Sequence, residues 1–139
     1  MNGYSILHDR PIDRMTAHMN PYTCSTIYSV IRSTAWKKGM AILGKKRFTD
    51  PGTSELQFEL AVCYLGKSRV IPILMWLRSN ENPPFDKRDE IPFARWWNDK
   101  EKEPDRKNLL KIMTEALSDK QSSDDALLLE GIEKSFNAY

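Results

Sequence analysis

The clearest hydrophobic pattern in the chain lies between Thr53 and Leu74. From Leu56 to Val62, apolar side chains occupy nearly the whole circumference of a helix, so the pattern predicts a helix that other elements cover on most sides. After a turn at Gly66-Lys67, the continuous apolar run Val70–Leu74 is typical of a parallel strand that is buried on both faces. We therefore expect this helix and this strand to form the centre of the fold.

Shorter apolar runs before this stretch predict two further strands, at Gly3–Leu7 and Gly39–Leu43. The stretch Asp9–Tyr22 between them is polar and contains two prolines, which predicts a long loop. Ser25 or Thr26 is a suitable N-cap for a helix over Ile27–Arg32. The order of elements in this half of the chain is therefore strand, loop, helix and strand.

The second half of the chain begins with the Pro- and charge-rich segment 78–90, which shows no periodicity. Ile91–Phe93 is short enough for an edge strand, and a strong amphipathic helix begins near Asp105. Strands that alternate with helices predict a doubly wound α/β fold with a parallel sheet. We expect one domain over residues 1–118 and a tail over residues 119–139, in which Ala126–Phe136 is a candidate short helix.

Composition narrows the functional classes. The 139 residues suffice for one domain with a real core, and 40% hydrophobic and 29% charged residues are ordinary for a globular protein. Because the net charge is only +2 and the basic residues are scattered, we expect neither a nucleic-acid partner nor a membrane partner. Two cysteines, Cys24 and Cys63, fit a reducing cytoplasmic setting, and their spacing predicts no metal site. No apolar run approaches the ~20 residues of a membrane span.

Two groups of residues are candidates for chemistry. Glu55 and Glu59 are four positions apart and lie on one face of the predicted central helix. A single helical glutamate is more often a solvated carboxylate than a catalytic group, here with Lys67 or Arg69 as its partner. The pair Trp96-Trp97 could stack a base or nicotinamide; alternatively, one ring packs in the core and the other covers the last helix.

Several motifs together resemble the TIR (Toll/interleukin-1 receptor) domain, and the NAD-cleaving members most closely. Gly3–Asp9 (GYSILHD) is similar to the second strand of that family and Ile27–Arg32 (IYSVIR) to its second helix. Met40–Gly44 is similar to the third strand, although Gly44 stands where the family often has Ser, and Glu55 stands where many members have Trp. The "VIPIL" run and Trp96 or Trp97 match two further positions of the family.

The resemblance implies a flavodoxin-like sheet of parallel strands with helices on both faces. The family's first strand and helix have no counterpart before Gly3. Because that strand lies in the middle of the sheet, its absence would leave backbone groups unpaired. The chain could be a fragment or short isoform, another segment or subunit could fill the slot, or the strand assignment is wrong. We expect an N-terminally truncated TIR domain.

The same resemblance implies an NAD glycohydrolase in which Glu59 is the catalytic carboxylate. One carboxylate near the ribose can stabilise the positive charge that develops as the nicotinamide bond breaks. Asp9, Arg10, Glu55 and Trp97 are the implied substrate-binding residues. NAD would be a substrate, and no cofactor is expected. Asp50–Thr53 with Glu59 also resembles nucleoside deoxyribosyltransferases, which act on the same type of bond.

The alternative function is a non-catalytic TIR interaction module of innate-immune signal transduction in the cytoplasm. Such a module would act as a homo-oligomer with other TIR domains, through the loop Asp9–Tyr22 and neighbouring surfaces.

Overall fold

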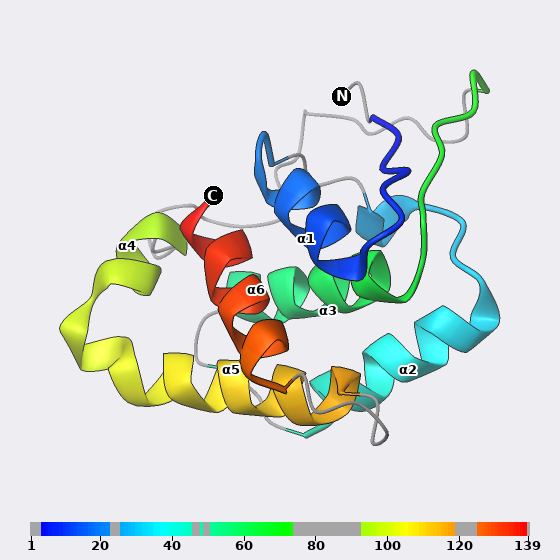
Figure 1. Cartoon of the computed structure of the whole chain (residues 1–139). Helices are drawn as coiled ribbons and strands as arrows, with labels where there is room; N and C mark the ends of the chain where they lie inside the picture. The colour runs from blue at the N-terminus through cyan, green and yellow to red at the C-terminus, as the bar shows by residue number, and fades with distance from the viewer. Residues whose placement is uncertain are drawn as a thin grey trace, which may run out of the picture.

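A computed structural model of the chain describes residues 4–22, 26–45, 48, 51–73, 93–118 and 125–138. Within these residues the structure is 72% helix and 3% strand. The elements, in chain order, are α1 (Pro11–Met19), η1 (Thr26–Tyr28), α2 (Ser33–Leu43), α3 (Pro51–Leu65), α4 (Phe93–Asn98), η3 (Lys100–Lys102), α5 (Glu103–Leu117) and α6 (Asp125–Asn137) (Figure 1).

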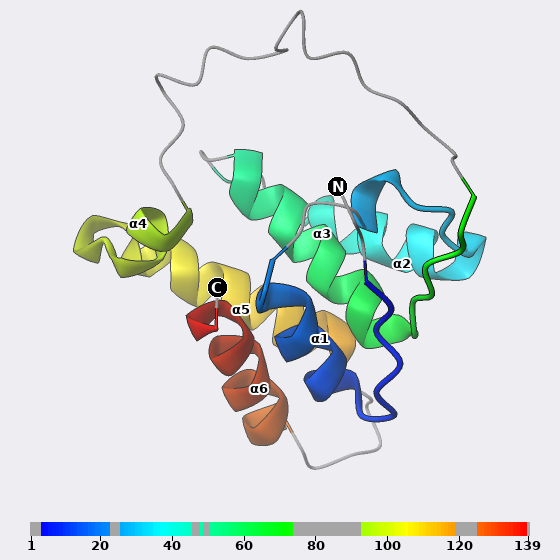
Figure 2. The ribbon, with the colours of Figure 1, turned by 90° about the horizontal axis from the view of Figure 1, so that it is seen from above.

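Helix α3 is the centre of the bundle, and it packs against α1, α2 and α5. Both views show α3 between α1 on one side and α2 on the other (Figures 1 and 2). The side chains of Leu56, Phe58, Leu60 and Ala61 are at most 3% exposed. The prediction of a central helix that is covered on most sides is therefore confirmed.

Helix α6 closes the bundle by packing on α1 and α5. Gly131 allows its close approach to α1, because a Cβ atom at this position would lie 2.5 Å from Cδ1 of Ile12. Leu109 and Met113 of α5 are fully buried in the same core. The helices predicted near Asp105 and over Ala126–Phe136 are both present, as α5 and α6.

The predicted flavodoxin-like α/β fold is wrong, because the described residues form no sheet. Gly39–Leu43 belongs to helix α2, and the first predicted strand contributes only one antiparallel bridge, from Ile6 to Ser68. Residues 70–73 form no strand, and the side chains of Val70 and Ile73 are 48% and 67% exposed. Residues 3, 74 and 91–92 of the predicted strands, and residue 25 as a predicted N-cap, lie outside the described residues. A strand needs at least one neighbouring strand to pair its backbone N–H and C=O groups, and the described residues supply none for residues 70–73.

The predicted loop Asp9–Tyr22 is also wrong, since most of it is helix α1. Pro11 suits the first helical position, where its missing N–H is not needed. The helix buries four side chains at helical spacing, Arg14, Met15, His18 and Met19. The predicted helix over Ile27–Arg32 is reduced to the single turn η1. Because the described part of the chain has no sheet, it also has no gap of the kind that a missing central TIR strand would leave.

Candidate functional site

The carboxylate of Glu59 lies in the middle of α3 and is 0% exposed. Its Oε2 atom is 2.9 Å from Nε2 of His18 and accepts a 3.0 Å hydrogen bond from the hydroxyl of Tyr22. Its Oε1 atom accepts a 3.1 Å hydrogen bond from the backbone N–H of Ile27. One carboxylate therefore joins α3 to the end of α1, to the residues after it and to η1.

His18 is the cationic partner in this cluster. Burial opposes charge on its ring, but contacts with Cys63 and Glu59 outweigh burial and raise the pKa of His18 to about 9. The ring is therefore protonated at neutral pH, and both ring nitrogens act as donors. Since the side chain of His18 is only 2% exposed, the two residues form a buried imidazolium–carboxylate pair.

Tyr4 and Arg14 hold the backbone around this pair. The hydroxyl of Tyr4 lies 2.7 to 2.9 Å from the carbonyl oxygens of Ala17, His18 and Pro21, at the end of α1. Burial, with electrostatic contributions from Cys63 and Glu59, raises the pKa of the Tyr4 hydroxyl. The cluster is thus fixed from the N-terminal segment as well as from the helices.

The buried guanidinium of Arg14 donates to four carbonyl oxygens. Nε donates to Cys63 at 2.8 Å and Nη2 to Tyr64 at 2.6 Å, both in the last turn of α3. Nη1 donates to Asp9 at 2.7 Å and to His8 at 3.0 Å, just before α1. Because the last carbonyls of a helix have no partner within it, Arg14 serves as a side-chain cap for α3.

The polar atoms of this cluster are already bonded within the core, which leaves a substrate no open position beside Glu59. Both oxygens of Glu59 already have partners, and a protonated His18 has no lone pair with which to accept a proton. A substrate would have to displace three donors to reach the carboxylate. Among the described residues, no group of three His, Cys, Asp or Glu side chains could hold a metal ion.

The predicted substrate-binding residues do not gather around Glu59. Asp9 is 94% exposed and pairs with Lys67 at 2.5 Å, a contact that lowers the pKa of the Asp9 carboxyl. Arg10 pairs with Asp13 at 3.8 Å on the exposed side of α1. Glu55 is one turn before Glu59 on α3, but it is half-buried rather than enclosed.

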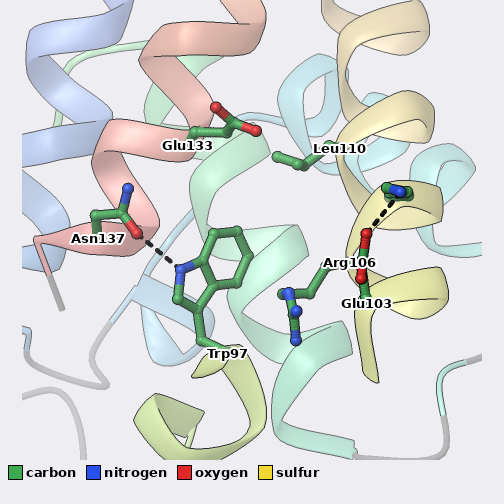
Figure 3. Close-up of a pocket in the computed structure, with 7 residues that line it drawn as sticks. Trp97, Glu103, Arg106, Leu110, Glu133 and Asn137 are labelled. Carbon is green, nitrogen blue, oxygen red and sulfur yellow. Dashed lines mark hydrogen bonds and ion pairs between the residues drawn. The ribbon is translucent and has the colours of Figure 1, made fainter. Parts of the chain in front are cut away.

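Trp97 lies in a different place, a pocket of about 290 Å³ between α4, α5 and α6 (Figure 3). Its ring stacks on Phe136 with a centroid distance of 4.6 Å, and its Nε1 donates to Oδ1 of Asn137 at 2.8 Å. Trp96 is fully buried. Trp96 therefore packs in the core, as the alternative account expects of one tryptophan, while Trp97 packs on α6 and lines a pocket with residues of α5. The pocket is lined by Trp97, Glu103, Arg106, Lys107, Leu110, Glu133 and Asn137.

The polar groups of this pocket are mostly paired with one another. Lys107 forms a 2.6 Å ion pair with Glu103, and Arg106 donates to the carbonyl oxygens of Trp96 and Asp99. Glu59 does not line the pocket. The structure therefore does not bring Trp97 and Glu59 together in this pocket.

The structure also shows an exposed surface that sequence reasoning missed, which we call the α2 face. Val30, in the link between η1 and α2, is 85% exposed, and Trp36 and Met40 of α2 are 42% and 44% exposed. The ring of Trp36 is held by an edge contact with Phe58 at 5.1 Å. The sequence does carry a signal for the basic character of this surface, because no Asp or Glu occurs between Asp13 and Asp50. The α2 face consists of Tyr28, Val30, Arg32, Trp36, Lys37, Lys38 and Met40.

The chain matches no protein-family model, no curated protein and no solved structure.

Proposed function

We propose that the chain is a non-catalytic interaction module that docks through the α2 face. The observation that carries this proposal is the exposure of three apolar side chains, Val30, Trp36 and Met40, on a part of the chain whose charged residues are all basic. Large apolar side chains that a fold leaves exposed close together are a feature of binding surfaces.

The environment of Glu59 favours docking over turnover. A catalytic carboxylate must reach the reacting atoms of its substrate, whereas Glu59 is 0% exposed and has three hydrogen-bond partners. NAD cleavage by Glu59 remains a competing prediction, to be tested alongside.

The docking surface differs from the one that the sequence indicated. The segment Asp9–Tyr22 uses Arg14, Met15 and His18 to build the core, so much of it is unavailable to a partner. Helix α2 packs on α3, where the buried Gly39 faces Phe58 and the ring of Trp36 contacts the same phenyl ring, while Lys37 and Met40 stay exposed.

The test compares the assembly state of the chain in lysates of cells that express it naturally. We expect wild type in a large or sedimentable assembly, and we expect Val30→Asp to reduce that fraction about tenfold, because the change places an unpaired carboxylate in an apolar contact. Leu127→Asp is the matched control, because Leu127 is 60% exposed on α6, away from the α2 face. Equal distributions of wild type and Val30→Asp would overturn the proposal.

The competing activity is tested with the purified chain and NAD, followed by chromatography of the products. We expect no nicotinamide release. Circular dichroism verifies that Glu59→Gln is folded. If wild type releases nicotinamide and the folded Glu59→Gln variant does not, Glu59 is catalytic and the proposal of a non-catalytic module is wrong.

A further inference from the structure

We infer that the α2 face binds the surface of an anionic lipid bilayer. This inference rests on the proposed function and names the partner for the same surface. Charge, the type of exposed apolar residue and the position of these residues in the fold support it.

Charge is strongly segregated along the chain. Residues 1–73 contain ten basic and five acidic residues, whereas residues 74–139 contain eleven basic and fourteen acidic residues. The small net charge of +2 therefore conceals a basic half and an acidic half. A surface built from the first half attracts anions even though the whole chain is nearly neutral.

The basic side chains of the α2 face are available for such a partner. Arg32, Lys37 and Lys38 are exposed, and none of them forms an ion pair with another described residue. Lys45, just beyond α2, is exposed as well. Anionic headgroups could neutralise these cations without breaking any existing ion pair among the described residues.

The apolar residues are of the kind that enters a bilayer. Val30 protrudes from the link between η1 and α2, and Val70, Ile71 and Ile73 follow α3 at 48%, 50% and 67% exposure. Both views place this link and the segment after α3 at the same end of the molecule (Figures 1 and 2). That end therefore carries four exposed aliphatic side chains.

Aliphatic side chains distinguish the possible partners. Binding to single-stranded nucleic acid relies on aromatic stacking, to which Val and Ile cannot contribute. Protein interfaces are depleted in Lys, whereas the α2 face carries two exposed lysines, Lys37 and Lys38. Protruding aliphatic residues flanked by Lys and Arg, with Tyr28 and Trp36 beside them, match an interfacial membrane contact. In this arrangement Val30 enters the acyl boundary, while Lys37 and Lys38 contact the headgroups.

The experiment is co-sedimentation of the full chain with vesicles of phosphatidylcholine alone, or of phosphatidylcholine with phosphatidylserine. We expect binding to the vesicles that contain phosphatidylserine and at least about tenfold weaker binding to the neutral vesicles. Raising the salt concentration from about 0.1 M to about 1 M should weaken binding, because the Debye length falls from about 10 Å to about 3 Å.

Two variants and two controls locate the contact. Lys37→Glu and Val30→Asp should each reduce binding to the anionic vesicles by about tenfold or more. Lys134→Glu makes the same change in net charge on α6, and Leu127→Asp makes a similar apolar-to-acidic change there, so both should bind like wild type. Thermal unfolding by circular dichroism verifies that all four variants are folded.

Several outcomes overturn the inference. Equal binding to neutral and anionic vesicles does so, as does equal loss in Lys37→Glu and Lys134→Glu. Tighter binding to duplex DNA that is insensitive to Val30→Asp would make nucleic acid the partner. Absence of vesicle binding, together with a lysate assembly that depends on Val30, would make the partner a protein and leave the proposed function standing. If the chain neither binds vesicles nor forms a Val30-dependent assembly in lysates, both the docking proposal and the membrane inference are wrong.

Discussion

Nε2 of His18 lies 2.9 Å from Oε2 of Glu59, and both side chains are closed to solvent. The pair connects α1 to α3 inside the core, so its protonation state is coupled to folding. Buried ion pairs add little net stability over an apolar replacement, but loss of one partner leaves an uncompensated charge.

The first prediction concerns pH. The pKa of His18 is raised from 6.5 to about 9 in the folded chain, so folding favours the protonated ring. The stabilisation is complete below about pH 6.5 and is lost as pH rises towards 9, at up to about 3 kcal/mol. Urea unfolding at several pH values should show this decrease in wild type. In His18→Gln the decrease should be absent; an unchanged pH profile in that variant would contradict the assignment.

The second prediction separates Glu59 from its partner. Glu59→Ala should lower the free energy of unfolding by about 3 to 5 kcal/mol, because His18 is then a buried charge without its counter-ion. The double variant His18→Leu/Glu59→Leu should lose less free energy of unfolding than the single variants His18→Leu and Glu59→Leu lose together, since no lone charge remains in the double variant. Strict additivity in denaturant unfolding would show that the two side chains are not coupled.

The third prediction concerns Gln57 on α3. Its side chain is 0% exposed, and neither Oε1 nor Nε2 has a hydrogen-bond partner. Because a buried polar group without a partner costs about 1 to 3 kcal/mol, Gln57→Leu should raise the free energy of unfolding by roughly that amount. Thr114→Val on α5 is a matched case, since Oγ1 of Thr114 also lacks a partner. A lower thermal midpoint in Gln57→Leu would contradict this account.

The fourth prediction concerns the contact of α2 with α3. A Cβ atom on Gly39 would lie 2.8 Å from Cε2 of Phe58, a ring that is 1% exposed and has little room to move. Gly39→Ala should therefore destabilise the protein by about 1 to 3 kcal/mol, even though Ala is the better helix former. Gly66→Ala is the control, because a Cβ atom there meets nothing within 4 Å. Equal thermal midpoints for the two variants would show that the contact can relax.

The sequence predicted the elements whose apolar residues repeat at helical spacing. In α5, Leu109, Leu110 and Met113 define one buried face, and the near-complete apolar circumference of α3 correctly predicted a central helix. It did not predict α2, because the short apolar run Gly39–Leu43 fits a strand as well as the end of a helix. Only the helix-forming residues before that run distinguish the two.

The buried cluster was only half predictable. The sequence pattern singles out Glu59, but it predicts a loop for its partners His18 and Tyr22, because Pro11 and Pro21 indicate breaks. The i, i+4 pairs Arg14/His18 and Met15/Met19 were the available helical signal. The distance from His18 to Glu59 depends on how α1 docks against α3, and local spacing carries no information about that packing.

The cap formed by Arg14 has a consequence for the order of folding. Its donors bind carbonyls 49 and 50 positions later in the chain, so this cap cannot form until two distant segments have met. Closing so long a loop is entropically unfavourable, and the reward comes only after α1 has docked. We therefore expect Arg14→Met to accelerate unfolding more than it slows folding, which stopped-flow kinetics would resolve. The last turn of α3 would then be among the last regions to become protected from hydrogen exchange during refolding.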